Sequence, residues 1–175
     1  MSTSSDGRPW PRGRRAAAAL LFSLLLLAPE RVAAQDYAPD RAAALDDGVL
    51  TIAFVGDVLL GGSVGDAIAR AGVHHPWELV RDVFARADFV VANLETSVAH
   101  GGTPEDKQFT FRAEPRTLEG LAAAGIDLVT LANNHSLDYG RDALLETLAH
   151  LDAHGVLRVG AGANAAEAYA PAIVE

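Results

Sequence analysis

The sequence predicts an α/β domain built on a mostly parallel sheet, and two observations carry this prediction. First, short apolar runs rich in β-branched residues recur at residues 50–55, 89–92 and 126–132. Second, the stretches between these runs change to helical spacing, in which apolar residues return every three or four positions. Alternating strands and helices are typical of βαβ units, whose strands run parallel and whose helices cover the sheet.

The predicted helices follow from the apolar residues that share one face. Such faces occur in the stretches 77–84 and 118–122. The clearest helix is 141–154, which has four leucines on one side and Gly155 in the position of a C-terminal cap. A further strand is predicted directly after it, at residues 157–159.

One connection breaks this alternation. Residues 96–108 are rich in glycine, proline and charge, and loops of this length inside a compact domain tend to be functional. The loop leads into a predicted short strand at 109–112 and then to Pro115, which suits the first turn of a helix. Residues 173–175 are predicted to begin another strand, so we expect this domain to continue beyond Glu175.

The first 34 residues are predicted to be a secretory signal peptide. Arg12, Arg14 and Arg15 precede the 13-residue apolar run 16–28, and small residues follow at 32–34. A helix needs about 20 residues to cross a bilayer, so an uncleaved anchor is the weaker alternative. Residues 35–48 are predicted to be a linker and 49–175 the folded domain. The protein is then periplasmic, extracellular or on the cell surface.

Composition limits the classes of partner and of site. Removing residues 1–34 takes five basic and two acidic residues from totals of 14 Lys+Arg and 23 Asp+Glu, which leaves a net charge of −12. An acidic surface repels nucleic acid, so no nucleic-acid partner is expected. The chain has no cysteine, which excludes disulfides and thiolate ligands. Any metal ion must therefore be held by oxygen and imidazole.

Polar residues follow three of the predicted strands. Asp57 follows the first, Glu95 the second, and Asn134 with His135 the third. Ligands of parallel sheets bind outside the carboxyl ends of the strands, where these residues can meet. Oxygen donors with one imidazole suit Mn²⁺, Mg²⁺, Fe or Zn²⁺. Each residue taken alone also has a structural interpretation, as a turn residue or a histidine of the core.

Five segments of the chain carry a resemblance to a known family. They are Phe54-Val55-Gly56-Asp57, Asn93-Leu94-Glu95, residues 109–115, residues 131–140 and residues 160–164. They look like successive motifs of the CapA family, the capsule and poly-γ-glutamate synthesis proteins. The block from Asn133 to Gly140 is the most specific, and it is also similar to a block of secreted 5′-nucleotidases. The family's fold resembles that of calcineurin-like metallophosphoesterases, which implies the N-terminal half of an αββα sandwich.

The resemblance implies separate roles for the residues at the strand ends. Asp57, Glu95 and Asn134 would be ligands of a divalent metal ion or of two such ions. His135 would be catalytic, as a proton donor to the leaving group, because imidazole titrates near neutral pH. One departure from the phosphoesterase signature is the absence of a histidine after Asp57, where Val58 and Leu59 follow.

Five further residues are expected to support this site. Asn93, Asn133 and Asp138 would orient the ligands and the histidine without binding metal themselves. Lys107 and Arg112 flank the short strand after the long loop, and either could bind a phosphate or carboxylate of the substrate. A surface role for Arg112 is an equal alternative.

The remaining histidines are not expected to complete the site. His150 and His154 have the i, i+4 spacing of a helix-borne pair, but they fall in the last turn, where imidazole favours solvent or the helix dipole. His74 and His75 precede a proline in a connection. His100 lies in the long loop without a recognisable partner.

Three functions remain open. The resemblance implies an exported protein that acts in making or exporting capsule or poly-γ-glutamate. Its partners would be an anionic polymer or a phosphate-bearing substrate, and membrane-bound synthesis machinery. The ligand set favours a metal-dependent phosphoesterase similar to 5′-nucleotidases, or a polymer hydrolase. Because a histidine is missing after Asp57, a metal-free binding module is the third alternative.

Overall fold

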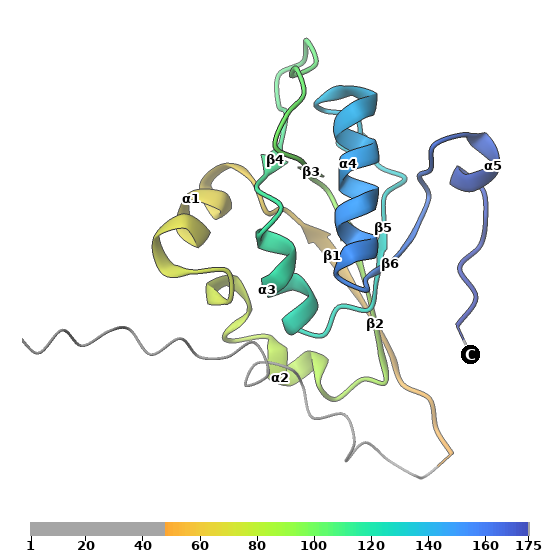
Figure 1. Ribbon diagram of the computed structural model, residues 1–175. Coiled ribbons are helices and arrows are strands. Elements are labelled where there is room, and N and C mark those ends of the chain that lie inside the picture. The colour runs from red at the N-terminus through yellow and green to blue at the C-terminus, as the bar shows by residue number, and fades with distance from the viewer. Residues whose placement is uncertain (1–47, 175) are drawn as a thin grey trace, which may run out of the picture. The chain divides into compact units, whose positions relative to one another are not determined.

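Four parallel strands in the order β1-β2-β5-β6 organise residues 48–174, the part of the chain that the computed structural model describes (Figure 1). Strands β3 and β4 form a second, two-stranded parallel sheet. The strands are β1 (Ile52–Val58), β2 (Phe89–Leu94), β3 (Ser97–Val98), β4 (Arg112–Ala113), β5 (Leu128–Thr130) and β6 (Leu157–Val159). The helices are α1 (Gly62–Ala71), the 3₁₀ helix η3 (His75–Trp77), α2 (Arg81–Phe84), α3 (Thr117–Ala123), α4 (Gly140–Ala153) and α5 (Ala165–Ala168). The prediction of an α/β fold with a mostly parallel sheet is confirmed.

Helices α1, α2, α3 and α4 pack on one face of the four-stranded sheet. Alternate residues of β2, Val90, Ala92 and Leu94, are at most 1% exposed, because successive side chains of a strand point to opposite faces. They belong to one apolar cluster with buried residues of α1, α2, α3 and α4. This α-layer on a β-layer agrees with the predicted N-terminal half of a metallophosphatase-like sandwich.

The opposite face of the sheet exposes apolar side chains. Ile52 and Phe54 of β1 are 45% and 76% exposed. Together with Phe89 and Val91 of β2 they line an open apolar groove. Side chains of this kind are what the second sheet of an αββα sandwich would cover.

The pairing of β1 with β2 is irregular where the first acidic residue lies. Phe54 pairs with Val91, and the register then shifts so that Asp57 lies opposite Asn93. An irregularity of this kind changes the direction of the side chains that follow it. Asp57 therefore lies beside the end of β2, and Glu95 is the residue that follows this strand.

Several elements differ from those predicted. The apolar face at 77–84 is divided between η3 and α2, and the strand expected at 126–132 is limited to β5. Only Arg112 of the strand expected at 109–112 lies in β4, and residues 173 and 174 form no strand. Helix α1 was not predicted, because Gly62 and Gly65 have low helix propensity. The helix predicted at 141–154 is confirmed as α4, and Gly155 follows it with a positive φ of 70°.

The predicted signal peptide, residues 1–34, lies outside the described residues, as does the predicted linker apart from Gly48. Among residues 48–174, no helix combines the length and the apolar character needed to cross a membrane.

Candidate functional site

The polar residues at the strand ends meet through Asn93, which lies near the end of β2. Its amide nitrogen donates to Asp57 Oδ1 at 2.9 Å and to Glu95 Oε2 at 3.3 Å. Its amide oxygen accepts from Thr130 Oγ1 at 2.9 Å and from Asn133 Nδ2 at 3.0 Å. These two acceptors and two donors fix the orientation of the amide. Asn93 thereby holds two carboxylates from neighbouring strands beside each other.

The two carboxylates influence each other's ionisation. The pKa of Asp57 is lowered, first because Asn93 donates to it and second because Glu95 can donate when protonated. The pKa of Glu95 is raised, because hydrogen bonding to Asp57 favours the protonated form, and burial and the charge of Asp57 add to this effect. The pair therefore concentrates negative charge in a small region, which is an environment that favours a cation.

His135 lies beside Glu95, and Asp138 and Phe111 hold its ring in place. Its Nδ1 is 2.8 Å from Asp138 Oδ2, and its Nε2 is 3.6 Å from Glu95 Oε1. The ring of Phe111 packs against the imidazole with centroids 4.6 Å apart. His135 is only 9% exposed, so its position is determined by these neighbours.

Asp138 determines which nitrogen of His135 carries a proton. The carboxylate is fully buried. Burial raises its pKa, but donation by Lys107, by His135 and by the backbone N–H of Phe111 outweighs burial, so the pKa is lowered. An ionised carboxylate only accepts hydrogen bonds, and Nδ1 must therefore be the donor. Nε2 remains the nitrogen that faces Glu95.

The loop after β5 gives its two asparagines different surroundings. Asn133 donates to the carbonyl of Leu94 at 2.9 Å and accepts from the backbone N–H of His135 at 2.9 Å. Ser136 donates to Asn133 Oδ1 at 3.2 Å and to the carbonyl of Leu131. Asn134 is exposed, and within residues 48–174 its side chain makes no hydrogen bond. The Asn134 amide is thus free to bind a ligand.

The two predicted substrate-binding cations differ in position. Lys107 donates to the carbonyl of Asn134 at 2.6 Å and forms an ion pair with Asp138. Arg112 instead donates to the carbonyl of Gly101 at 3.0 Å, and its guanidinium lies 4.7 Å from the centre of the Tyr139 ring. Among the described residues, Lys107 thus contacts the site at the strand ends, whereas Arg112 contacts the loop that contains Gly101.

Sequence reasoning missed two contributors to the site. Thr130 lies at the end of β5 and orients Asn93, and its place in an apolar strand was the only available signal. Phe111 packs on His135, and its backbone N–H donates to Asp138 at 2.5 Å. No pattern connects Phe111 with His135, because the contact depends on the path of the long loop.

The carboxylate, amide and imidazole side chains at the carboxyl ends of parallel strands define an α/β domain with a polar site at the sheet edge. More narrowly, the chain belongs to the family described as bacterial capsule synthesis protein PGA_cap, whose sequence profile matches residues 51–175. The predicted membership of the CapA family is thereby confirmed.

Two curated relatives give the extent of this similarity. The chain is 27% identical over 124 residues to the PGA biosynthesis protein CapA of Bacillus subtilis (strain 168), which covers 70% of this chain and 33% of the relative. It is 29% identical over 119 residues to the capsule biosynthesis protein CapA of Bacillus anthracis, which covers 66% of this chain and 29% of the relative. The chain thus spans about a third of the length of these relatives.

Proposed function

We propose that this protein is exported and acts in the synthesis or export of capsule or poly-γ-glutamate, through a divalent-metal site at the ends of β1, β2 and β5. The names of the two Bacillus relatives, which refer to capsule and PGA biosynthesis, support the polymer. The observation that carries the site is that Asn93 donates to both Asp57 and Glu95, while His135 lies 3.6 Å from Glu95. Export follows from the signal peptide predicted at residues 1–34. Membrane-bound synthesis machinery is the proposed partner.

The donor set fits a hard or borderline divalent cation. Asp57 and Glu95 would supply carboxylate oxygens and Asn134 an amide oxygen, which are ligands that Mg²⁺ and Mn²⁺ accept, as do Fe and Zn²⁺. The pKa of Glu95 is raised first by its hydrogen bonding to Asp57, then by burial, and also by repulsion from the negative charge of Asp57. A cation between the two carboxylates would offset this repulsion. The proposal includes one or two such ions, as the resemblance to metallophosphoesterases implies.

The residues of the site would contribute to hydrolysis of a phosphate ester or of the polymer. A bound divalent ion supplies Lewis-acid polarisation of a phosphoryl or carbonyl oxygen. Asp138 accepts from Nδ1 of His135, so Nε2 is the atom that would give a proton to the leaving group when the ring is doubly protonated, which leaves a neutral imidazole with its remaining proton on Nδ1. Phe111 covers one side of the imidazole ring and so limits the approach of water from there.

Lys107 and Arg112 are the proposed contacts for the anionic groups of the substrate. Lys107 has the stronger support, because it bonds to the carbonyl of Asn134, although Asp138 neutralises part of its charge. Arg112 would have to leave the carbonyl of Gly101 to reach the strand ends. The high negative charge of the chain makes such local cations necessary for contact with a polyanion.

A metal-free binding module is the second candidate function. The observation that favours it is the sequence after Asp57, where Val58 and Leu59 follow and the phosphoesterase signature has a histidine. A module of this kind would bind the polymer without cleaving it.

Metal content and hydrolysis, measured together, test the proposal. The purified protein is loaded with Mn²⁺ and assayed on a phosphodiester and on poly-γ-glutamate. The metal content of Asp57→Ala and Asn134→Ala, and the activity of His135→Ala, are compared with those of the wild type. We expect the first two variants to lose metal and activity, and His135→Ala to keep metal while losing activity. Polymer binding by a wild type that holds no metal would favour the binding module instead.

A further inference from the structure

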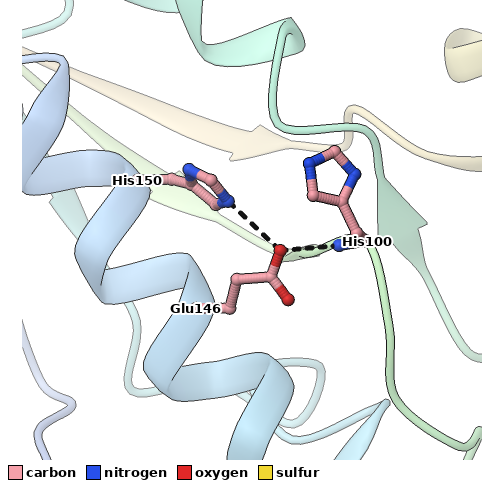
Figure 2. Close-up of side chains that lie close together, drawn as sticks. All are labelled: His100, Glu146 and His150. Carbon is pink, nitrogen blue, oxygen red and sulfur yellow. Dashed lines mark hydrogen bonds and ion pairs between the residues drawn. The ribbon is translucent and has the colours of Figure 1, made fainter.

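A second group of possible metal ligands lies between α4 and the loop after β3. His100 follows β3 by two residues, and Glu146 and His150 project toward it from α4 (Figure 2). One ligand atom from each of the three side chains lies within 4.8 Å of the other two. None of the three residues belongs to the site at the strand ends.

Hydrogen bonds already hold the central carboxylate of this group. Glu146 Oε1 accepts from the backbone N–H of His100 at 2.8 Å and lies 3.2 Å from His150 Nε2 (Figure 2). Glu146 and His150 are one helical turn apart, so both face the same direction. The rings of His100 and His150 meet edge to face, with centroids 5.9 Å apart. Two imidazoles thus flank a carboxylate whose orientation is fixed.

A fourth donor comes from the strand that pairs with β3. Glu114 follows β4, and its Oε2 is 3.6 Å from Nδ1 of His100. The side chains of His100 and Glu114 are 71% and 64% exposed, while those of His150 and Glu146 are 27% and 31% exposed. An ion could therefore enter from solvent and meet two ligands that are partly buried.

We propose that His100, Glu146 and His150 bind one Zn²⁺ ion, with Glu114 as the fourth ligand. Zinc bonds of about 2.1 Å to nitrogen and oxygen in a tetrahedron put neighbouring ligand atoms about 3.4 Å apart. The distances of 3.2 Å from Glu146 to His150 and 3.6 Å from His100 to Glu114 are close to that value. Glu114 lies outside the group of three whose ligand atoms are within 4.8 Å of one another, so its exposed side chain would turn toward that group to complete the tetrahedron.

The ligand chemistry selects zinc over the harder cations. Two imidazole nitrogens with two carboxylate oxygens suit Zn²⁺, whereas Mg²⁺ and Ca²⁺ prefer ligand sets made of oxygen alone. Four protein ligands leave no open position for a substrate, which is the arrangement of a structural zinc site. The two carboxylates also match the charge of the ion.

Such an ion would fasten the long loop to the helical layer. The backbone of Val98 in β3 already exchanges hydrogen bonds with Thr147 of α4, at 2.8 Å and 3.1 Å. The ion would extend this connection by tying His100 and Glu114, at the ends of β3 and β4, to the same helix. The loop between these strands carries Lys107, which contacts the site at the strand ends. The zinc site therefore stabilises the path of the loop and takes no part in chemistry.

Zinc binding to single-residue variants tests this proposal. All variants are made in a background chain that also carries Asp57→Ala and Asn134→Ala. The site at the strand ends then does not contribute to the measured binding. The result for the zinc site is therefore independent of whether the site at the strand ends binds metal. Isothermal titration with Zn²⁺ should give one equivalent bound per background chain. His100→Ala and His150→Ala should each weaken binding at least about tenfold. Glu146→Gln, which keeps an acceptor for the His100 N–H, should also weaken it.

The matched control is His154→Ala, because His154 is a histidine just after α4 that is not a proposed ligand. Within residues 48–174, the ring of His154 hydrogen-bonds only to the carbonyl of His150, through Nδ1. This variant should bind zinc as tightly as the background chain. Circular dichroism confirms that each variant is folded, and Co²⁺ in place of zinc should give the intense visible bands of a four-coordinate site. The proposal is overturned if the background chain binds no zinc, or if His100→Ala and His150→Ala bind it with unchanged affinity.

Discussion

Replacing the buried Asp138 with asparagine is expected to lower the free energy of unfolding by about 3 kcal/mol. The carboxylate accepts from the backbone N–H of Phe111 at 2.5 Å and from His135 Nδ1 at 2.8 Å, and it pairs with Lys107. Each hydrogen bond to a charged group contributes about 1.5 to 3 kcal/mol. Asparagine keeps one acceptor oxygen but replaces the other with an amide NH₂, which is itself a donor and cannot accept from these donors. We therefore expect the equivalent of two such bonds to be lost, at the low end of that range.

The charge of Asp138 also predicts how this loss depends on pH. Burial opposes ionisation, but the three donors outweigh it and lower the pKa below the ordinary value of 3.8. A carboxyl group whose pKa is lower in the folded state contributes its full stability above the unfolded value, and loses it as the pH falls through the folded value. The difference between wild type and Asp138→Asn should thus be complete at neutral pH and shrink below 3.8.

Urea unfolding followed by circular dichroism, at neutral pH and at several acidic values, measures this difference. Asp106→Asn is the control, because Asp106 lies exposed in the same loop as Lys107, and it should change the free energy of unfolding by less than about 0.5 kcal/mol. The reasoning is refuted if the two variants are equally stable at neutral pH. A deficit of Asp138→Asn that persists unchanged in acid would show that the charge is not its source.

Three further substitutions have expected outcomes of their own. Gly102→Ala places a Cβ at a φ of 98° and against the backbone carbonyl oxygen of Tyr139, so it should destabilise by more than about 1 kcal/mol in thermal unfolding. Gly101→Ala, whose Cβ meets no atom within 4 Å, should be tolerated in the same measurement. Leu151→Ala removes a fully buried side chain and should cost about 2 to 5 kcal/mol in urea unfolding, whereas Leu79→Ala, at a side chain 92% exposed, should cost little. Asn93→Ala should weaken Mn²⁺ binding about 10- to 100-fold in calorimetry, because Asn93 holds two proposed ligands in place; unchanged affinity would contradict that role.

The parallel sheet and the helix α4 could be predicted because their signals are local. A buried parallel strand is a nearly continuous apolar run, and the leucines of α4 repeat at helical spacing before Gly155. The ends of these predicted strands also indicated that Asp57, Glu95 and Asn134 with His135 would come to one edge of the sheet. Polar residues in the last positions of the strands or in the loops that follow them therefore carried most of the information about the site.

The remaining features depend on contacts that no local pattern records. Helix α1 begins at Gly62, and its stability comes from burying Ile68 in the core rather than from helix propensity. The orientation of Asn93 depends on Thr130, 37 residues away in sequence. His100 had no recognisable partner in the sequence, because Glu146 lies 46 residues further on and meets it only when β3 packs on α4.

Binding of Mn²⁺ to the strand-end site tests the central claim most directly, because this ion prefers the oxygen donors of that site to imidazole. Calorimetric titration would compare the wild type with Asp57→Ala and Asn134→Ala. Glu105→Ala serves as a control at an exposed acidic residue of the long loop. We predict that the wild type and the control bind Mn²⁺ alike, and that each of the other variants binds it at least about tenfold more weakly. Equal affinity in all four proteins, or no binding by the wild type, would contradict the assignment of Asp57 and Asn134 as metal ligands.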